Sequence, residues 1–196
     1  MEKISIYLNS VWLLSKGAWK FLETRLVKIE LKEGEVLLRP GETCTMLWFI
    51  GEGLLRSYEH FDRKEYCNWF MQKNDIATSV VSYFDEVPTD ETVEALEDSV
   101  VYGISKSDLF AGLLRHRSLL MLTFLLTVKY YCQTRKMESA LRKKNSKQLY
   151  DFLLRHHPEL VGRVDNKYLA TFMGIGETSL YNIKLEKKNA KPDKGM

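Results

Sequence analysis

The sequence pattern with the clearest chemical meaning lies near the C-terminal end, in DNKYLATFMGIGETSLYNIKLEKK (165–188). Its apolar spacing predicts a helix, a tight turn over GIG (174–176), and a second helix that starts at Glu177. A small residue at Ala170, a glycine four positions later and an aliphatic residue at Leu180 would let the two helices cross at a steep angle. This arrangement is typical of a helix-turn-helix, although an ordinary hairpin of two helices has a similar pattern.

In a helix-turn-helix, the second helix enters the major groove of DNA, and the outward residues of its first turns meet the base edges. Asn182 can form a two-bond pair with adenine, and Thr178 can contact the methyl group of thymine. Lysine side chains suit phosphate oxygens, which position a protein on DNA without reading its sequence. The residues that we expect to contact DNA are Lys167, Thr171, Glu177, Thr178, Ser179, Tyr181, Asn182, Lys184, Lys187 and Lys188.

A long apolar segment precedes these helices and must position them. From Leu109 to about Arg142 there is no proline and one glycine, so the sequence predicts a single long helix. Its apolar residues cover nearly the whole circumference, and such a helix must be covered on all sides. One face can pack on the domain before it, and the other against the same helix of a second subunit. We therefore expect a homodimer; the alternative is an internal core helix of a monomer.

A short polar segment follows this long helix. The residues KKNS (143–146) predict a hinge, and Ser146 is expected to cap a helix that runs from Lys147 to His156. Pro158 follows this helix, as expected after a helix stop.

The first half of the chain has the pattern of a β-rich domain. Over residues 29–104, short apolar or aromatic runs alternate with Gly, Pro, Asn and Asp, which predicts an all-β barrel or sandwich. Gly34, Gly41 and Gly53 are expected in turns, because glycine reaches positive φ without a clash at Cβ. Apolar residues over 10–27 have near-helical spacing, so we expect a short helical cap on the barrel.

Charge separates the two ends of the chain, although the formal net charge is only +3. The residues through Val128 contain 14 Lys+Arg and 19 Asp+Glu, whereas the remaining residues contain 15 Lys+Arg and 7 Asp+Glu. This separation indicates a polyanion-binding region attached to a domain of another kind. A merely solvated basic helix would give the same charges.

Cysteine usage and hydropathy indicate the compartment. Cys44, Cys67 and Cys132 form neither a disulfide framework nor a CxxC metal motif, so we expect them as small apolar filler in a reducing cytoplasm. The N-terminus lacks a secretory signal pattern, and the most apolar run (119–128) is shorter than a membrane-spanning helix. We therefore expect a cytoplasmic protein without membrane contact.

Several segments, in this order, resemble the Crp/Fnr family of bacterial transcription regulators. Those similar to the family's first barrel strands are LKEGEVLLRPGE (31–42) and LWFIGEGLLRSY (47–58). EALEDSVVYGISKSDL (94–109) resembles its last strand and the start of the dimer helix, and YLATFMGIGETSLYNIK (168–184) resembles its helix-turn-helix.

The resemblance implies an α+β chain in three parts. These are a β jelly-roll domain of the cyclic nucleotide-binding type over residues 1–107, a dimerisation helix over 108–143 and a helix-turn-helix domain over 144–196. It further implies a homodimer that binds double-stranded DNA, with an unidentified small-molecule effector and RNA polymerase as additional partners.

The expected effector site departs from the family's nucleotide-binding pattern. Nucleotide-binding members hold the cyclic phosphate with a Gly-Glu pair and, about ten residues on, an Arg followed by Ser or Thr. Here Thr78 and Ser79 stand near the first pair, and Thr89, Asp90 and Glu91 stand near the Arg. Carboxylates repel a phosphate, so we expect no binding of cyclic AMP or cyclic GMP. A neutral or cationic ligand would suit Asp90 and Glu91 better, although exposed loop carboxylates are the plainer interpretation.

Two other functions compete with this interpretation. A cupin-type metalloenzyme needs several histidines in its barrel, whereas the β-region contains only His60. A GxSxG elbow and a glycine-rich phosphate loop are also absent from the sequence, so we expect neither enzymatic activity nor a metal or other cofactor. The second alternative is a dimeric ligand-sensing or interaction protein with a vestigial helix-turn-helix, since the reading helix lacks arginine, the strongest base reader.

Overall fold

The computed structural model describes residues 2–142 and 145–189, and it begins with two helices. These are α1 (Glu2–Val11) and α2 (Lys16–Glu23), so the helical cap expected over 10–27 starts earlier and is made of two pieces. The helical conformation is interrupted between them, and Ser15 caps α2: its Oγ accepts a hydrogen bond from the Ala18 amide at 3.2 Å.

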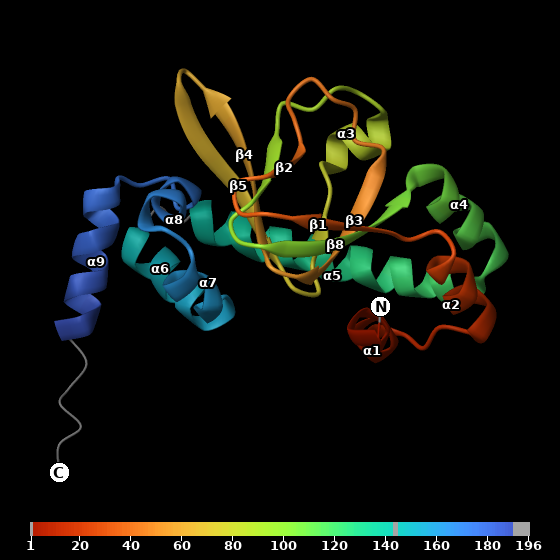
Figure 1. Ribbon diagram of the computed structural model, residues 1–196. Helices are drawn as coiled ribbons and strands as arrows, with labels where there is room; N and C mark the ends of the chain where they lie inside the picture. Colours follow the sequence, from red (N-terminus) through yellow and green to blue (C-terminus); the bar gives the residue numbers. More distant parts are fainter. Residues whose placement is uncertain (1, 143–144, 190–196) are drawn as a thin grey trace, which may run out of the picture.

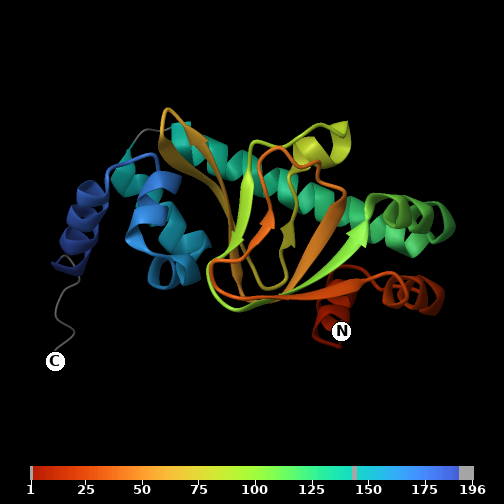
Figure 2. The same ribbon diagram turned by 45° about the horizontal axis from the view of Figure 1, so that its top comes forward.

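Two four-stranded antiparallel sheets form the middle of the chain (Figure 1, Figure 2). The first sheet has the order β1 (Val27–Leu31), β8 (Ser99–Ser105), β3 (Met46–Glu52) and β6 (Ile76–Ala77). The second has the order β2 (Val36–Leu38), β7 (Thr92–Ala95), β4 (Leu54–Phe61) and β5 (Lys64–Gln72). Their shared core contains Ile50, Leu55, Val93 and Val101, all at most 2% exposed. This confirms the predicted β-rich domain.

The turns of this domain follow the glycine pattern, with one unexpected element. Gly34, Gly41 and Gly53 all have positive φ, as expected from the sequence. A short helix, α3 (Val80–Asp85), follows β6 and was not predicted. Its sequence, VVSYFD, has the apolar character of a strand, so periodicity over six residues could not identify it.

The prediction of one continuous helix from Leu109 to Arg142 is wrong. The structure has α4 (Lys106–Arg115) and α5 (Arg117–Arg142), separated at His116, whose backbone is extended at φ −128° and ψ 100°. Gly112 lies at this corner, where an added Cβ would stand 2.7 Å from the Phe21 ring and 2.8 Å from Leu119. The break therefore depends on close tertiary packing, which helical periodicity does not reveal.

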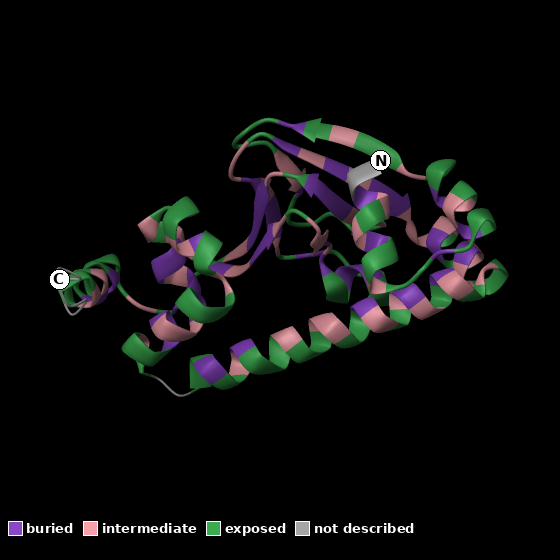
Figure 3. Cartoon of the chain, turned by 90° about the horizontal axis from the view of Figure 1, so that it is seen from below, coloured by how far each residue is buried: buried purple, intermediate pink, exposed green. Residues whose placement is uncertain are grey.

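Helix α5 runs along the β-domain with one covered face and one open face (Figure 1, Figure 3). Leu119, Leu122 and Leu126 are buried in a cluster that includes the N-terminal helices. The open face of α5 carries four apolar side chains that are 43–66% exposed: Leu120, Phe124, Val128 and Tyr131.

None of the described helices is long and apolar enough to cross a membrane.

Four helices complete the described chain. They are α6 (Ser146–His156), α7 (Pro158–Arg163), α8 (Asn166–Phe172) and α9 (Glu177–Asn189). Asn145, rather than the expected Ser146, caps α6: its Oδ1 accepts from the amides of Lys147 and Gln148 at 3.1 and 3.2 Å. Residues 143–144 of the expected hinge lie outside the described residues.

The cysteines divide between core and surface. Cys44 and Cys67 are buried as expected, and burial raises the pKa of the Cys67 thiol to about 12. Cys132 is exposed on α5, which corrects the expectation that all three would be core filler. Its position on the solvent side of α5 explains the difference.

Candidate nucleic-acid interface and effector cavity

Helices α8 and α9 form the two helices and the turn that the sequence predicts. Ala170 and Leu180 are 2% and 0% exposed, so the small residue and the aliphatic residue both lie in the buried cluster to which the two helices contribute. Gly174 has φ +64°, a left-handed conformation that favours glycine. The Ile175 amide then donates to the Ala170 carbonyl at 3.0 Å, which closes the end of α8.

The outward face of α9 is polar and open to solvent. The inward residues Leu180 and Ile183 anchor the helix. Figure 1 places α9 at the outer edge of the molecule, away from both sheets. The exposed residues of its first turns are the five expected base readers: Glu177, Thr178, Ser179, Tyr181 and Asn182. Thr171 of α8 is half-buried, and its hydroxyl donates to the Tyr168 carbonyl at 2.9 Å.

Two of the lysines that were expected to contact phosphates are bound to other groups of the protein. The Lys184 ammonium donates to Asn166 Oδ1 and to the Val161 carbonyl, and burial lowers its pKa. The Lys187 ammonium lies 2.7 Å from a carboxylate oxygen of Asp151 on α6. These partners lie 18 to 36 residues earlier in the chain, so no local sequence pattern could identify them.

The two other expected phosphate contacts remain more accessible. Lys167 is exposed, and its ammonium lies 4.4 Å from the centre of the Tyr168 ring. Lys188 is exposed and forms no ion pair with any residue of the described chain. Lys188 is therefore the lysine of α9 that is free to meet a phosphate without first losing a partner.

A separate hollow of about 860 Å³ lies between the β-domain and helices α1 to α5. Side chains such as Phe49, Met71 and Leu122 make its walls largely apolar. Charged residues enter the lining only as carboxylates, and none of its described lining residues is a lysine, an arginine or a histidine. All five residues expected at the effector site line this hollow: Thr78, Ser79, Thr89, Asp90 and Glu91.

The two carboxylates differ in their surroundings. Asp90 is exposed, as expected of a loop residue, but Glu91 is half-buried. Glu91 Oε1 accepts hydrogen bonds from Ser57 Oγ and Asn68 Nδ2, both at 3.0 Å. The interpretation of Glu91 as an exposed loop carboxylate is thus wrong, because strands β4 and β5 bring two donors to it.

The three hydroxyl residues form hydrogen bonds within the protein. Ser79 Oγ and Thr89 Oγ1 lie 2.9 Å apart, and both residues are buried. Thr89 Oγ1 also accepts from the Glu91 amide at 3.0 Å, and Thr78 Oγ1 donates to the Met46 carbonyl at 3.4 Å. The polar end of the cavity is therefore held in place by hydrogen bonds within the protein.

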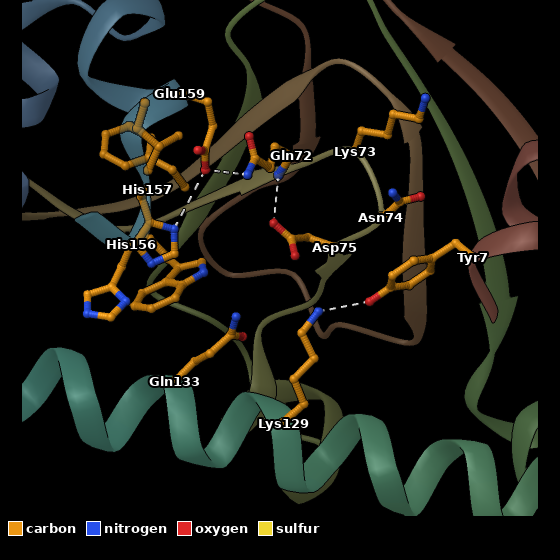
Figure 4. A pocket seen from close by; sticks show the side chains of 13 residues that line it. Tyr7, Gln72, Lys73, Asn74, Asp75, Lys129, Gln133, His156, His157 and Glu159 are labelled. Atoms are coloured by element: carbon orange, nitrogen blue, oxygen red, sulfur yellow. Dashed lines mark hydrogen bonds and ion pairs between the residues drawn. The ribbon is translucent and has the colours of Figure 1, made fainter. Parts of the chain in front are cut away.

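A smaller pocket of about 230 Å³ lies where the turn after β5 meets α5 and the junction of α6 and α7 (Figure 4). On one side, Gln72 Nε2 donates to Glu159 Oε1 at 2.6 Å, and Glu159 lies 3.8 Å from His157 Nδ1. On the other, the Lys129 ammonium donates to the Tyr7 hydroxyl at 2.8 Å. Burial lowers the pKa of His157, which favours the neutral ring. Side chains of the β-domain and of the C-terminal helices thus meet directly.

Comparison with known proteins gives a domain match and a set of structural matches. Residues 28–116 match the family model described as the cyclic nucleotide-binding domain. No curated protein matches the sequence significantly.

Solved structures match nearly the whole chain at low sequence identity. FixK2 from Bradyrhizobium japonicum has a TM-score of 0.69 at 14% identity, over 87% of this chain and 89% of that one. The global regulator CLP of Xanthomonas campestris, described as responsive to c-di-GMP, has a TM-score of 0.68 at 13% identity, over 92% and 96%. A putative regulator of the Crp/Fnr family from Eubacterium rectale has a TM-score of 0.67 at 17% identity, over 90% and 84%.

These matches agree with the geometry described above. Identities this low show the fold, and because the matches cover 87–92% of this chain, they extend beyond the β-domain to α5 and the C-terminal helices. Residues 28–116 are therefore similar to the cyclic nucleotide-binding domain, and the chain as a whole has the fold of solved regulator structures such as the Crp/Fnr family protein from Eubacterium rectale.

Proposed function

We propose that the protein is a homodimeric, DNA-binding transcription regulator of the Crp/Fnr type and that α9 enters the major groove. The observation that carries this proposal is the exposed polar face of α9, which begins at Glu177 on a helix at the outer edge of the molecule (Figure 1). Leu180 and Ile183 anchor the opposite face of the helix in the core, so the polar face points outward. A helix-turn-helix requires this combination to read DNA.

The base contacts follow from side-chain chemistry. Asn182 has the donor and acceptor pair that matches adenine, and the Thr178 methyl group suits a thymine methyl. Glu177 can accept from cytosine, and Ser179 and Tyr181 add hydroxyl donors and acceptors. Lys188 supplies charge toward phosphate, together with Lys167 at the start of α8.

A second copy of the chain is the proposed cover for the open face of α5. Leu120, Phe124, Val128 and Tyr131 follow one another at spacings of four, four and three residues, which places them on one side of the helix. Two copies of this stripe would bury each other in an isologous contact. The arrangement would also set two copies of α9 at a fixed separation.

The apolar hollow is the proposed effector site. Unlike the site of a cyclic nucleotide receptor, it should favour ligands without negative charge. A cyclic phosphate needs a cation or free amide donors, whereas this lining offers Glu59, Asp90 and Glu91. Arg56 on β4 does not help, because its guanidinium binds Glu65 and Glu94 instead. An uncharged or cationic molecule with an apolar body suits the cavity. Its binding would tune the action of the regulator with RNA polymerase in the cytoplasm.

One observation favours a second candidate, a ligand-sensing or interaction protein whose helix-turn-helix is vestigial. Helix α9 contains no arginine, and its Lys184 and Lys187 are held by Asn166 and Asp151. The electrostatic attraction between α9 and DNA phosphates would then be weak.

Titration of a mixed-sequence DNA duplex separates the two candidates. The regulator should bind the duplex at about 50 mM salt and lose affinity steeply toward about 200 mM, because phosphate contacts release counterions. Binding at neither salt concentration would contradict the proposal and support the vestigial candidate. In the same preparation, cyclic AMP at millimolar concentration should leave the thermal unfolding midpoint unchanged, and a clear upward shift would contradict the proposed ligand preference.

A further inference from the structure

The second sheet has two different faces, and the C-terminal helices cover the outer one. Ser57 on β4 lines the effector cavity, whereas Leu54 and Arg56 of the same strand lie on the opposite side, Leu54 in the cluster of the C-terminal helices and Arg56 against the Tyr168 ring. On that outer side, Phe70 of β5 packs edge-on against Phe172 of α8, with ring centroids 5.2 Å apart. Leu54 and Phe70 belong to the same buried cluster as the core of the helix-turn-helix. The sheet and the DNA-reading unit therefore share one apolar core.

Arg56 is the charged residue at the centre of this contact. It is only 3% exposed, and its Nη2 lies 3.1 Å from a carboxylate oxygen of Glu94 on β7. Its guanidinium also forms a two-atom contact with the carboxylate of Glu65 on β5. Both partners lie on the same sheet, so these ion pairs fix the guanidinium relative to the strands.

The remaining contacts of Arg56 are aromatic, and one of them comes from the helix-turn-helix. The guanidinium carbon lies 4.0 Å from the ring centre of Tyr58 and 3.7 Å from that of Tyr168 on α8. Within the described chain, Nε of Arg56 is buried without a hydrogen-bond partner. A cation held against an aromatic face and shielded from water is attracted more strongly than at an exposed site. The flat guanidinium thus contacts α8 through the face of the Tyr168 ring.

We propose that Arg56 is a positioning residue that sets the orientation of the recognition helix by docking Tyr168 of α8 on the sheet. The proposal rests on the function proposed above, because it concerns how that DNA-reading helix is held. Docking leaves the outward face of α9 free, so the docked state can still bind DNA. Two recognition helices must stand about 34 Å apart on one face of DNA, and rigid docking in each subunit maintains such a separation.

Surrounding contacts at the edge of the interface are weaker than those of Arg56. Arg163 of α7 pairs with Glu97 after β7, and Gln72 of β5 bonds to Glu159, but both pairs are partly exposed. An exposed ion pair and an exposed hydrogen bond each contribute little to holding two units together. The buried guanidinium and the apolar core under it therefore contribute most to fixing the orientation of the helix-turn-helix on the sheet.

Two substitutions remove the contact from opposite sides. Arg56→Met keeps the length of the side chain but removes its charge, whereas Tyr168→Leu removes the ring and leaves the ion pairs of the sheet intact. Tyr168→Phe is the matched control, because it keeps the aromatic face. Should Arg56→Met fail to fold because Glu65 and Glu94 lose their partner, Tyr168→Leu still tests the proposal.

The first readout needs no DNA: ¹⁵N relaxation gives separate rotational correlation times for amides of the β-domain and of residues 166–189. The two values should be equal in the wild type and in Tyr168→Phe. In Tyr168→Leu and in folded Arg56→Met, the helix-turn-helix should tumble faster than the β-domain, with the β-domain spectrum preserved. Equal values in these folded variants would overturn the proposal.

The second readout compares affinity for a DNA site selected from random sequence with affinity for mixed-sequence duplex. Loss of docking should lower affinity for the selected site about tenfold, because two freely moving recognition helices must be ordered on binding. Affinity for the mixed-sequence duplex should stay unchanged, since single phosphate contacts need no fixed separation. Unchanged affinity for the selected site in an undocked variant would overturn the positioning role. Absence of DNA binding by the wild type would instead contradict the proposed function and leave the relaxation result standing.

Discussion

Replacing Lys188 and Lys184 by methionine, one at a time, tests which basic side chains of α9 meet DNA phosphates. Lys188 is exposed and forms no ion pair with the described residues, whereas the Lys184 ammonium is held by Asn166 and the Val161 carbonyl. The same substitution at both positions removes the same charge from the same helix. Any difference between the two variants therefore reports the position of the ammonium group.

The expected magnitude follows from counterion release. Each phosphate contact adds about 0.9 to the slope of log K against log salt, so a dimer without both Lys188 contacts should lose about 1.8 from its slope. Over the fourfold change from about 50 to about 200 mM salt, Lys188→Met should then lose about 12-fold less affinity than the wild type. Lys184→Met should keep the wild-type slope and lower the free energy of unfolding by about 1 kcal/mol, because hydrogen bonds to Asn166 and Val161 are lost.

Fluorescence anisotropy of a labelled duplex over a salt series gives the slopes, and urea unfolding gives the stabilities. An equal reduction in slope for Lys184→Met would refute the reasoning, because its ammonium would then leave Asn166 to reach DNA. An unchanged slope for Lys188→Met would show that the last turns of α9 do not lie against the phosphates.

Five further substitutions, two of them controls, probe the turn, the subunit contact and a half-buried histidine. Gly174→Ala should lower the free energy of unfolding by about 1 kcal/mol because φ is +64°; Gly176→Ala, with open space around its Cβ, should change it by less than about 0.5 kcal/mol in the same urea titration. Phe124→Glu should convert the dimer to a monomer in sedimentation velocity, whereas Leu114→Glu, 90% exposed on α4, should not; a dimer that persists in Phe124→Glu would contradict the subunit contact. Burial holds the pKa of His157 below its ordinary 6.5, so the unfolded chain binds this proton more tightly and stability should fall as pH drops below 6.5. His157→Gln should flatten that part of the stability profile, and an unchanged profile would exclude His157 as its source.

The local features of the helix-turn-helix could be predicted because its geometry is encoded at short range. Ala170, Gly174 and Leu180 lie within eleven residues of one another, and steric demands at one helix crossing fix all three. The strands were predictable for the same reason, since apolar runs and turn glycines recur at short intervals.

What could not be predicted depends on residues far apart in the chain. The corner at His116 needs Phe21 of α2 against Gly112, and the hydrogen-bonded state of Glu91 needs donors from two other strands. The docking of Tyr168 on Arg56 joins residues more than a hundred positions apart. Such partners are set by the three-dimensional arrangement, and no periodicity in one segment contains them.

Selection of bound sequences from a pool of random duplex DNA, carried out at two salt concentrations, tests the central claim most directly. The account predicts recovery of a two-fold symmetric site whose half-sites lie one helical turn apart, retained at the higher salt concentration. Binding that vanishes with salt and enriches no sequence would contradict a dimeric regulator that reads DNA through α9.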